Sequence, residues 1–458
     1  MSPMDLRPNS DEARDIAYHF HSYTNPRMHE QNGPLIMDRG EGVHVFDTHG
    51  NKYIEGMSGL WSVAVGFNEQ RLIDAATRQM SKLPYYHNFA HRSHGPAIDL
   101  AEKLIGMAPV PMSKVFFTNS GSEANDTILK MVWYRSNAMG KPEKKKVISR
   151  IRGYHGVTIA SASMTGLPYN HKSFDLPLPG ILHTTCPHYW REGRDGESEE
   201  QFATRCAEDL DAMIQAEGPD TVAAFIAEPL MGAGGVVVPP KTYWEKIQAV
   251  LGKYDILLIA DEVICGFGRT GKMFGCETFN IKPDIMTMSK QITSSYFPFS
   301  AFMMTEEVYA PIADEAGRIG ILGHGYTGAA HPVGAAVALE NLKIIEERDL
   351  VANAAERGAE LQAGLRTFVD HPLVGEARGV GLIAALEIVA PEGRADEFAP
   401  GKLGAGMNAH FLKNGLISRN MMDAMAFCPP MIIQSSQIKE ILAAVEKSLD
   451  GFKTELAA

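Results

Sequence analysis

Pro283-Asp284-Ile285-Met286-Thr287-Met288-Ser289-Lys290 is a short apolar run that ends on a serine and a lysine. These residues predict a buried strand with Lys290 at its carboxyl end. Burial disfavours an ammonium group, so a lysine in this place needs a partner or a task. A neutral amine forms a Schiff base with an aldehyde, and pyridoxal phosphate is the aldehyde cofactor that such lysines bind. Taken alone, the stretch is equally consistent with a lysine on the surface.

A second apolar run, residues 256–260, ends in the carboxylates Asp261 and Glu262. The distance in sequence to Lys290 is long enough for a crossover connection, so the two runs can form parallel strands of one sheet. Their polar ends then emerge at the same edge, where open α/β sheets bind their ligands. Asp261 is therefore a candidate for the acidic group that faces the pyridine nitrogen of pyridoxal phosphate. A helix-capping aspartate is the alternative.

A site for the cofactor phosphate is expected further upstream. Residues 114–119 predict a strand, and a turn of small residues, Ser120-Gly121-Ser122-Glu123, leads from it into a helix that continues to residue 139. Ser120 and Glu123 have the spacing of a capping box. Free backbone N–H groups and the positive end of the helix dipole would point at an anion here. Ordinary strand-to-helix turns share this pattern.

Two further segments bring polar residues to the same predicted edge. Residues 222–227 form a third apolar run, which ends in Glu228. Residues 146–149 form a fourth, followed by Arg152-Gly153-Tyr154-His155-Gly156. Beside two glycines, Tyr154 can approach a flat ring closely and stack on it. An ordinary tyrosine in a turn is the alternative.

The totals restrict the class of protein. At 458 residues the chain exceeds one usual hydrophobic core, so two or three lobes are expected. An apolar fraction of 45% and 43 glycines are typical of globular α/β proteins. The net charge of -12 argues against nucleic acid or an anionic membrane as a partner. Because the five cysteines show no paired spacing and neither a signal peptide nor a membrane span is apparent, we expect a cytoplasmic protein.

Three histidines resemble a metal site at first sight. His87, His91 and His94 have spacings of four and three, which on a helix would place them on one face. Their neighbours form helices poorly, however, and no carboxylate lies among them. We therefore expect a polar loop in this region, and no metal in this protein.

A glycine pattern raises a rival function. Gly266-Phe267-Gly268-Arg269-Thr270-Gly271 matches the dinucleotide-binding pattern G-x-G-x-x-G, which indicates a nicotinamide-dependent dehydrogenase. Four residues separate the pattern from Asp261, and residues 272–275 do not begin a convincing amphipathic helix. This context disfavours the dehydrogenase.

The ends of the chain predict a smaller α+β lobe. Residues 43–46 and 52–54 flank a turn, and so predict a β-hairpin. A glycine-rich segment after the hairpin contains Trp61 and suits a loop that lines a pocket. Toward the C-terminus, helices are expected over residues 351–370, 404–414 and from about 436, and strands over 380–387 and 416–418.

Several of these segments, in this order, resemble the class III aminotransferases, and most closely the ω-amino acid or amine:pyruvate transaminase group. The most specific segments are Thr118-Asn119-Ser120-Gly121-Ser122-Glu123-Ala124-Asn125-Asp126, Tyr154-His155-Gly156, residues 261–271 and Ser289-Lys290. The similarity extends from Tyr23 to the last predicted helix. In this family the G-x-G-x-x-G match is part of the family's own pattern.

The resemblance implies an α/β fold of the fold-type-I pyridoxal phosphate enzymes. A large domain with a mostly parallel seven-stranded sheet would be joined by a smaller α+β domain built from both termini. The implied limits are residues 1–65 and 335–458 for the smaller domain and 66–334 for the large one. The family also implies a homodimer with shared active sites, or a tetramer built from such dimers.

The resemblance also assigns roles to individual residues. Lys290 would hold the cofactor as a Schiff base and then shuttle a proton, while Asp261 would keep the pyridine nitrogen protonated. Thr327 would reach the phosphate from the partner subunit, and Glu228 would orient the surroundings of Asp261. The full set of implied cofactor-binding residues is Ser120, Gly121, Ser122, Tyr154, His155, Glu228, Asp261, Val263, Lys290 and Thr327. The implied substrate-binding residues are Tyr23, Trp61, Phe89, Tyr154, Ala233, Ile264 and Arg419, the last a mobile arginine that binds a substrate carboxylate.

The expected reaction is a two-step transamination by a ping-pong mechanism. An amine or ω-amino acid would give its amino group to the cofactor, which would pass it to a keto acid such as pyruvate. The alternatives are a pyridoxal phosphate-dependent aminomutase or decarboxylating aminotransferase, a pyridoxal-binding regulator and the dehydrogenase. Two departures from the family concern the substrate range: residues 291–300 replace a glycine-rich stretch, and Ala330 stands where a glycine is common.

Overall fold

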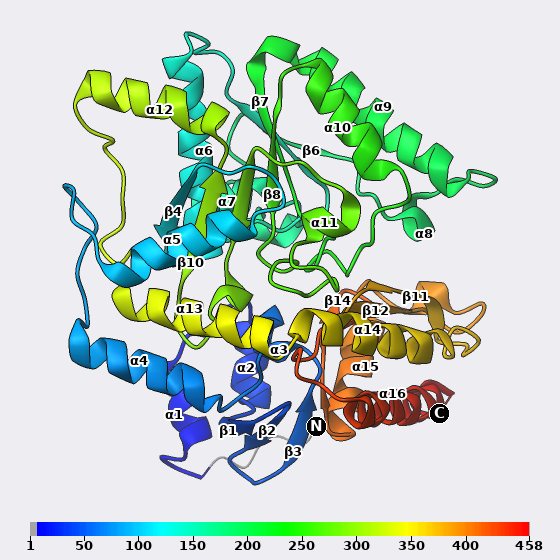
Figure 1. Cartoon of the computed structure of the whole chain (residues 1–458). Coiled ribbons are helices and arrows are strands. Elements are labelled where there is room, and N and C mark those ends of the chain that lie inside the picture. Colours follow the sequence, from blue (N-terminus) through cyan, green and yellow to red (C-terminus); the bar gives the residue numbers. More distant parts are fainter. Residues whose placement is uncertain (1–6, 458) are drawn as a thin grey trace.

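A seven-stranded sheet forms the centre of the larger lobe in the computed structural model, which describes residues 7–457 (Figure 1). Only β10 is antiparallel to its neighbours β4 and β9, and the remaining pairings are parallel. In spatial order the strands are β4 (Lys114–Thr118), β10 (Ser300–Met304), β9 (Ile285–Met288), β8 (Leu257–Asp261), β7 (Val222–Ala227), β5 (Lys146–Arg150) and β6 (Ile181–Thr184). The predicted mostly parallel sheet of seven strands is thus confirmed.

The two strands that decided the prediction are neighbours. β8 and β9 pair in parallel, with Asp261 opposite Thr287, so that Asp261 and Lys290 emerge at the same edge of the sheet. Every residue of both strands is buried. Full burial explains why these strands have continuous apolar runs instead of an alternating pattern. β6 and β10 were not predicted, since a short apolar run does not by itself distinguish a strand from a buried helix.

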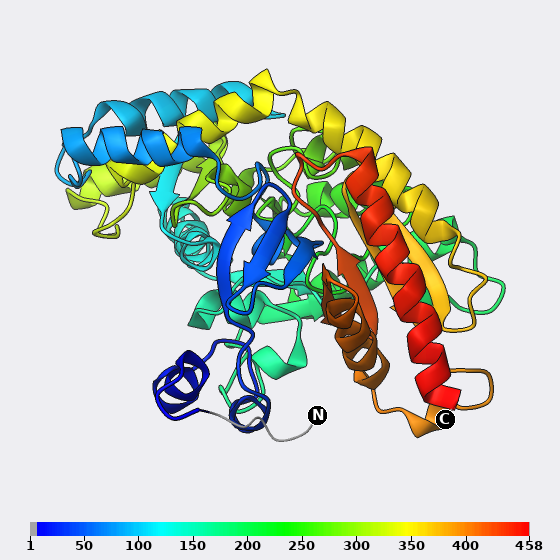
Figure 2. The same cartoon turned by 90° about the horizontal axis from the view of Figure 1, so that it is seen from below.

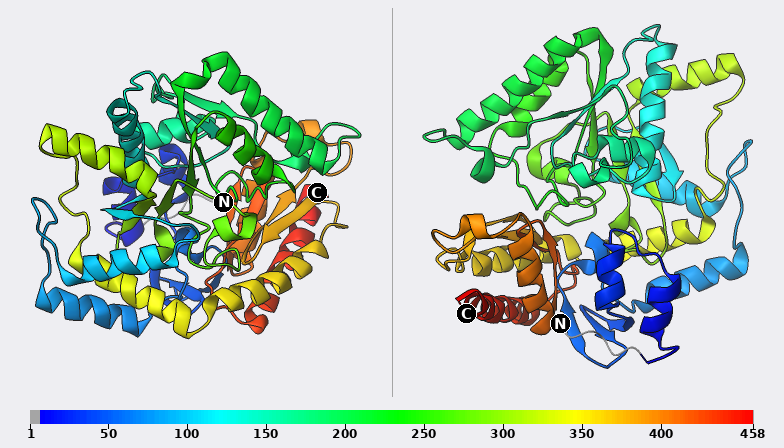
Figure 3. Two further views of the ribbon diagram at one scale, coloured as in Figure 1. Left: turned by 45° about the horizontal axis from the view of Figure 1, so that its top comes forward. Right: turned by 180° about the vertical axis from the view of Figure 1, so that it is seen from behind.

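Helices cover both faces of this sheet (Figures 1 and 3). Along β7, Phe225 and Ala227 pack on one side with α9 and α10, while Ala224 and Ile226 pack on the other with α6 and α12. This alternation follows from the two-residue period of a strand. The helices of this lobe are α4 (Gln70–Lys82), α5 (Gly95–Met107), α6 (Gly121–Ala138), α7 (Ile159–Met164), α8 (Tyr189–Glu192), α9 (Glu199–Glu217), α10 (Tyr243–Lys253), α11 (Gly275–Phe279), α12 (Glu306–Ile319) and α13 (Pro332–Glu347), with short 3₁₀ turns η1 (Pro168–Asn170), η2 (Pro219–Thr221) and η3 (Lys290–Ile292).

The smaller lobe combines segments from both ends of the chain (Figure 2). β13 pairs in parallel with β3, so Leu416 lies opposite Ile54 across more than three hundred residues of sequence. One sheet has the order β1 (Met37–Glu41), β2 (His44–Asp47), β3 (Lys52–Glu55), β13 (Leu416–Ile417), and the other β11 (Val374–Val380), β12 (Ile383–Ile388), β15 (Ala424–Phe427), β14 (Arg419–Met421). The helices here are α1 (Asp11–Tyr18), α2 (Pro26–Asn32), α3 (Ser58–Trp61), α14 (Leu350–Arg366), α15 (Lys402–Lys413) and α16 (Ser435–Ala457), with η4 (Ala395–Glu397).

The predicted β-hairpin is confirmed, and one predicted strand is wrong at its start. β2 and β3 pair antiparallel, and the Asp47 carboxylate accepts from the backbone N–H groups of His49 and Asn51 in the turn. The strand expected over 380–387 is instead the end of β11 and most of β12, separated by a tight turn. Gly381 occupies the left-handed region there with φ of 56°, and an added Cβ would collide with Thr270.

Three further expectations concern the whole chain. All five cysteines are buried and unpaired, as expected from their spacing. Within residues 7–457, none of the helices is both long and apolar enough to cross a membrane. The exact domain limits at residues 65 and 334 stay predictions, and residues 1–6 of the first segment lie outside the described part of the chain.

Glu55, the last residue of β3, makes the stability of the fold depend on pH. Its buried carboxyl accepts one backbone N–H, from Met57, and burial raises its pKa from 4.5 to about 7. Because the folded pKa is the higher one, this group contributes stability that is fully present below pH 4.5 and is lost as pH rises to about 7. The free energy of unfolding changes by about 3 kcal/mol over this pH range. We expect the melting temperature of Glu55→Gln, relative to the wild type, to be several degrees higher at pH 8 than at pH 5.

The control for this experiment is Glu446→Gln, which changes an exposed carboxylate on α16. The melting temperature of this variant, relative to the wild type, is expected to be the same at both pH values. An equal pH response of the two variants would contradict the role of Glu55.

Candidate active site

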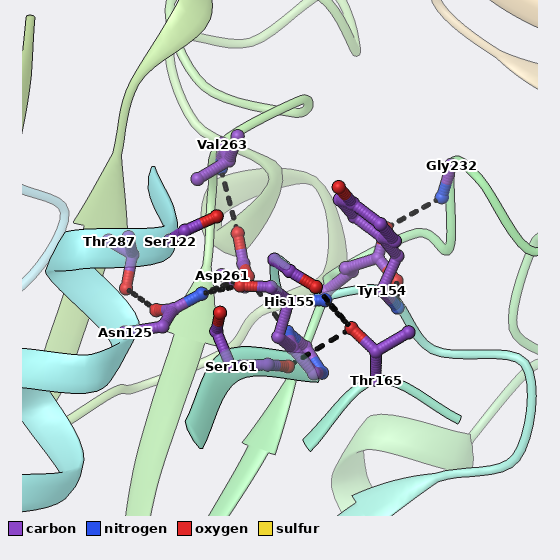
Figure 4. Close-up of polar contacts among 12 residues, drawn as sticks. Ser122, Asn125, Tyr154, His155, Ser161, Thr165, Gly232, Asp261, Val263 and Thr287 are labelled. Atoms are coloured by element: carbon purple, nitrogen blue, oxygen red, sulfur yellow. Dashed lines mark hydrogen bonds and ion pairs between the residues drawn. The ribbon is translucent and has the colours of Figure 1, made fainter. Parts of the chain in front are cut away.

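Asp261 lies at the carboxyl end of β8 and is held by donors from three elements (Figure 4). Its Oδ2 accepts from His155 Nδ1 at 2.8 Å and from Asn125 Nδ2 at 3.0 Å, and its Oδ1 accepts from the backbone N–H of Val263 at 3.1 Å. These donors fix the orientation of the buried carboxylate. Among the described residues Oδ1 has this single partner, so it can accept from a donor in the adjoining cavity.

Asn125 is a functional residue for which the sequence analysis had assigned no role. Thr287 Oγ1 donates to its Oδ1 at 2.8 Å, which turns the amide nitrogen toward Asp261 and toward the His155 carbonyl oxygen, 2.7 Å away. Asn125 therefore joins α6, β8 and β9 beside the carboxylate. The sequence signal for this role was a polar residue beside Ala124 on the predicted apolar face of α6. A buried amide there is expected to have hydrogen-bond partners.

Lys290 follows β9 directly and lines the same cavity as Asp261. Its backbone is in the left-handed region, with φ of 48°. Burial lowers the pKa of its amine, while the carboxylates of Asp261 and Glu228 oppose this shift. The lowered pKa increases the fraction of neutral amine, the form that reacts with an aldehyde. The predicted placement of Lys290 at a strand end beside Asp261 agrees with the structure.

The turn after Lys290 is held by a buried polar network. The Gln291 side chain donates to the carbonyl oxygens of Ile264 and Gly266 at 3.0 and 2.8 Å and accepts from Arg269 Nη2 at 3.3 Å. Asn341, on α13, donates to the Gln291 carbonyl oxygen at 2.7 Å. The side chains thus position the backbone that carries Lys290.

This network gives a physical account of the departures from the family pattern. Ser294 and Ser295 have φ of 49° and 59°, and Ala330 has φ of 55°, which costs about 1–2 kcal/mol for each residue that is not glycine. Ser294 Oγ offsets part of this cost, since it donates to Asn341 Oδ1 at 2.7 Å and accepts from Val65 N–H at 3.3 Å. These residues therefore keep the left-handed backbone conformation that usually favours glycine.

The amino terminus of α6 also lines the cavity. Ser120 caps the helix by accepting from the Glu123 N–H at 3.2 Å, as predicted. Glu123 accepts from the Asn119 N–H, at 2.8 Å, instead of closing the predicted capping box on Ser120. Gly121 and Ser122 line the cavity with first-turn N–H groups. A Cβ on Gly121 would approach Val263 Cγ2 to 3.2 Å, so this position is close-packed.

A cavity of about 130 Å³ joins these groups. Tyr154 lines it, and burial raises the pKa of the Tyr154 hydroxyl. The complete lining is Gly121, Ser122, Tyr154, His155, Gly156, Glu228, Asp261, Val263, Ile264, Ser289 and Lys290. Most of the implied cofactor-binding residues are therefore brought together by the fold.

Glu228 contacts two backbone segments, one of them at Tyr154, the residue before the His155 that donates to Asp261. Its two carboxylate oxygens accept from the backbone N–H groups of Tyr154 and Gly232 at 3.0 and 2.8 Å, and no described donor links it to Asp261. Burial raises the pKa of Glu228. Its contacts position Tyr154 and the turn that contains Ala233.

Of the implied substrate residues, Tyr154 and Ile264 line this cavity. Trp61 and Ile264 are buried in one apolar cluster, and Ala233 is partly buried nearby in the chain. Tyr23 is half-exposed, accepts from Asn170 Nδ2 at 2.6 Å, and lies edge-on to Tyr169 with ring centroids 6.3 Å apart. Its proximity to Tyr154 contributes to the raised pKa of that hydroxyl.

Arg419 begins β14 and is partly buried. None of the ion pairs within residues 7–457 includes Arg419. Its charge opposes the rise in the pKa of Tyr154 and lowers that of Lys290, so it lies close to the cavity. An unpaired guanidinium there is suited to bind a carboxylate.

Phe89 and Thr327 lie outside the cavity of their own chain. Both are exposed, and Tyr85 Oη donates to the Thr327 carbonyl oxygen at 2.8 Å. Gly325 places Phe89 against the same loop, since an added Cβ would lie 2.8 Å from the Phe89 ring. Neither residue is among those that line the cavity.

The two rival motifs have other environments. His94 caps α5 and its Nε2 lies 2.7 Å from the Ala330 carbonyl oxygen, while His87 accepts from the Phe89 N–H, so these histidines do not converge with His91 on one point. The glycine pattern at 266–271 forms turns and does not begin a helix. Its Arg269 is buried and donates to the carbonyl oxygens of Leu382 and Pro429.

Arg378 is a second residue that the sequence analysis missed. Its guanidinium donates to the carbonyl oxygens of Gly235 and Val236 at 2.5 and 3.1 Å and pairs with Glu376 and Glu387 at 2.6 and 2.7 Å. It ties the turn that contains Ala233 to the smaller lobe. No local pattern indicates this role, because the partners are remote in sequence.

Comparison with known proteins gives consistent matches. A family model described as Aminotransferase class-III matches residues 26–449. The chain is similar to the ω-transaminase of Pseudomonas jessenii in complex with PMP, with 59% identity, a TM-score of 0.96 and coverage of 98% of this chain and 99% of that one. A structure described as a transaminase with L-alanine has 65% identity, a TM-score of 0.91 and coverage of 92% and 100%. The gamma aminobutyrate transaminase 1, mitochondrial, of Solanum lycopersicum is 50% identical over 418 residues, 91% of this chain and 81% of that protein.

Proposed function

This chain belongs to the class III aminotransferases, and we propose that it transfers the amino group of an amine or an ω-amino acid to a keto acid such as pyruvate in two half-reactions. The observation that supports this most is the joint placement of Lys290, Asp261 and the amino terminus of α6 around one cavity. An amine, a carboxylate and an anion site in this arrangement match the chemical groups of one cofactor.

The class uses pyridoxal phosphate, and the residues present fit it. When bound, the cofactor supplies an aldehyde that takes up an amino group and a conjugated ring that withdraws electrons from the substrate carbon. The N–H groups of Gly121 and Ser122 are suited to its phosphate. Val263 and Tyr154 line the space for its ring.

Lys290 and Asp261 have separate roles in this proposal. The neutral amine of Lys290 would carry a proton between the substrate carbon and the cofactor, so a single base serves both proton transfers of each half-reaction. Asp261 would keep the ring nitrogen protonated, because its Oδ1 can accept there while His155 and Asn125 orient its Oδ2. The Asp261 carboxylate is thus oriented before substrate enters, which is a condition for efficient catalysis.

We propose that the active enzyme is a homodimer with shared active sites. Phe89 and Thr327 are exposed on one surface and fit the implied roles of substrate and phosphate contacts only across a subunit boundary. Size-exclusion chromatography with light scattering tests the assembly, and a monomer with full activity would contradict shared sites.

A donor screen tests the reaction itself. Purified protein with pyridoxal phosphate and pyruvate is expected to form alanine from one or more members of a panel of amines and ω-amino acids, which includes γ-aminobutyrate. Loss of carbon dioxide from the donor would favour a decarboxylating aminotransferase, and an isomeric amino acid without pyruvate consumption would favour an aminomutase. If no donor yields alanine, the proposal is contradicted, and a pyridoxal-binding regulator is the remaining alternative.

Arg419 is expected to decide between charged and uncharged substrates. Replacement of Arg419 by alanine removes the unpaired guanidinium near the cavity, so we expect kcat/KM for substrates with a carboxylate to fall roughly 10- to 100-fold, the value of a charge-assisted hydrogen bond of 1.5–3 kcal/mol. Half-reactions with amines that lack a carboxylate are expected to change little.

The half-reactions are measured separately by following the cofactor absorbance after addition of donor alone. Arg394→Ala is the matched control, since Arg394 forms an ion pair with Glu397 at the surface. Equal losses for charged and uncharged donors would disprove the selective role of Arg419.

A further inference from the structure

Three histidines of the amino-terminal segment converge on one carboxylate. Asp15, on α1, lies 3.1 Å from His19 Nδ1 through its Oδ1, and its Oδ2 lies 2.8 Å from His21 Nε2 and 2.9 Å from His29 Nε2. The residues come from the end of α1, the linker and α2, which lie at the edge of the smaller lobe in Figure 2. The convergence is therefore a product of the tertiary structure.

The spacing of these atoms is close to that of a coordination sphere. The ligand atoms of Asp15, His19 and His21 all lie within 4.8 Å of one another. Ligands at 2.0–2.1 Å from a tetrahedral zinc ion are about 3.3 Å apart, close to the contacts of 3.1 and 2.8 Å that the Asp15 carboxylate makes with His19 and His21. The two histidine nitrogens, which lie within 4.8 Å of each other, would close the sphere by moving toward the cation. The ring centroids of His21 lie 4.2 Å from those of both His19 and His29.

We propose that Asp15, His19 and His21 bind one divalent transition-metal cation of the zinc class, with water in the remaining position, while His29 Nε2 contacts Asp15 Oδ2 at 2.9 Å. Imidazole nitrogens and carboxylate oxygens are donors that such cations take, whereas Ca²⁺ and Mg²⁺ prefer oxygen ligands. Asp15 and His21 are partly buried, whereas the His19 side chain is 65% exposed. The cation fastens the end of α1 to the linker that follows it.

The site has a consequence for the substrate pocket. Tyr23 lies two residues after His21, in the left-handed region with φ of 51°, and accepts from Asn170 Nδ2. A cation that holds His21 also limits the motion of Tyr23. The site thus couples metal binding to the order of a residue close to Tyr154, which lines the cavity.

A second group with suitable donors does not fit a cation. His188, Glu376 and Glu387 also lie within 4.8 Å of one another. Arg378 pairs with both carboxylates, and Arg191 pairs with Glu387. The two guanidinium groups already neutralise these carboxylates, so a metal ion would meet positive charge.

Direct binding measurements test the proposal. The holoenzyme, treated with a chelator and dialysed, is titrated with Zn²⁺ in a calorimeter and its metal content is then determined. We expect one Zn²⁺ per chain, a higher melting temperature and slower proteolysis between α1 and α2. Co²⁺ in place of zinc is expected to show the visible absorption bands of a low-symmetry site with nitrogen ligands.

The variants Asp15→Asn and His21→Gln keep hydrogen-bonding side chains but are weaker ligands. Each is expected to reduce Zn²⁺ affinity roughly tenfold or more, and the double variant to abolish stoichiometric binding. His410→Gln, which removes a surface histidine paired with Glu455, is the control and is expected to bind zinc as the wild type does. Absence of stoichiometric binding by the wild type, or equal binding by all variants, would overturn the site in favour of a purely hydrogen-bonded cluster.

Discussion

Replacement of Lys290 by alanine is expected to lower turnover with an amine and pyruvate by at least 10²–10⁴-fold, the contribution of a positioned general base alone. Lys290 is the only lysine that lines the cavity of the described chain, and burial lowers the pKa of its amine. The substitution removes both the nucleophile and the proton carrier. The other residues that line the cavity include no second amine to replace them. Steady-state kinetics with each half-reaction measured separately checks the result.

A chemical readout accompanies the kinetics. Borohydride treatment of the holoenzyme is expected to attach the cofactor to the peptide that contains Lys290, and mass spectrometry of the variant is expected to show no attachment. Lys272→Ala, which changes an exposed lysine, is the control and should retain both activity and attachment. Full turnover by the Lys290 variant would refute the proposed mechanism.

Replacement of Asp261 by asparagine is expected to reduce kcat by about 10²–10³-fold with a smaller change in KM, as for removal of one preorganised electrostatic contact. The substitution removes the negative charge that the cavity presents to a ring nitrogen. The amide oxygen can still accept from His155 Nδ1 and Asn125 Nδ2, which both donate to the present Oδ2 at 2.8 and 3.0 Å. The amide NH₂ group then faces the Val263 N–H, which loses its acceptor Oδ1.

Asp284→Asn provides the matched control. Asp284 precedes β9, and its carboxylate accepts from the Leu258 N–H at 2.7 Å, at the end of the strands opposite Asp261. This variant tests the cost of changing a partly buried carboxylate of the same sheet without touching the cavity. Comparable losses of kcat in both variants, with unchanged melting temperatures, would contradict a specific role for Asp261.

Local sequence was sufficient for the parts of the site that depend on one strand or one turn. The apolar runs that end at Asp261 and Lys290 are fully buried parallel neighbours, because each run is long enough for a strand and the connection between them is long enough for a crossover. The cap at Ser120 follows from the hydrogen-bonding capacity of one side chain. Continuous apolar runs also account for the core of the large sheet, since strands buried on both faces have no polar side.

Contacts between remote segments were decided only by the tertiary structure. Asn125, Gln291 and Arg378 position the reactive groups through partners on other elements, and no periodicity or short spacing indicates such partners. The contact of Glu228 with the Tyr154 N–H has the same origin. The contact between His29, on α2, and Asp15, on α1, likewise depends on the tertiary structure.

The sequence by itself therefore predicted the family and its cofactor through the resemblance, and it placed Asp261 and Lys290 at strand ends, because strand burial and turn chemistry are local properties. The tertiary structure decided which side chains orient Asp261 and Lys290, and how a backbone without glycine keeps the turn after Lys290. The physical reason is that a buried polar group needs a hydrogen-bond partner, and that partner can lie on a segment remote in sequence. No local pattern around either residue then indicates the contact.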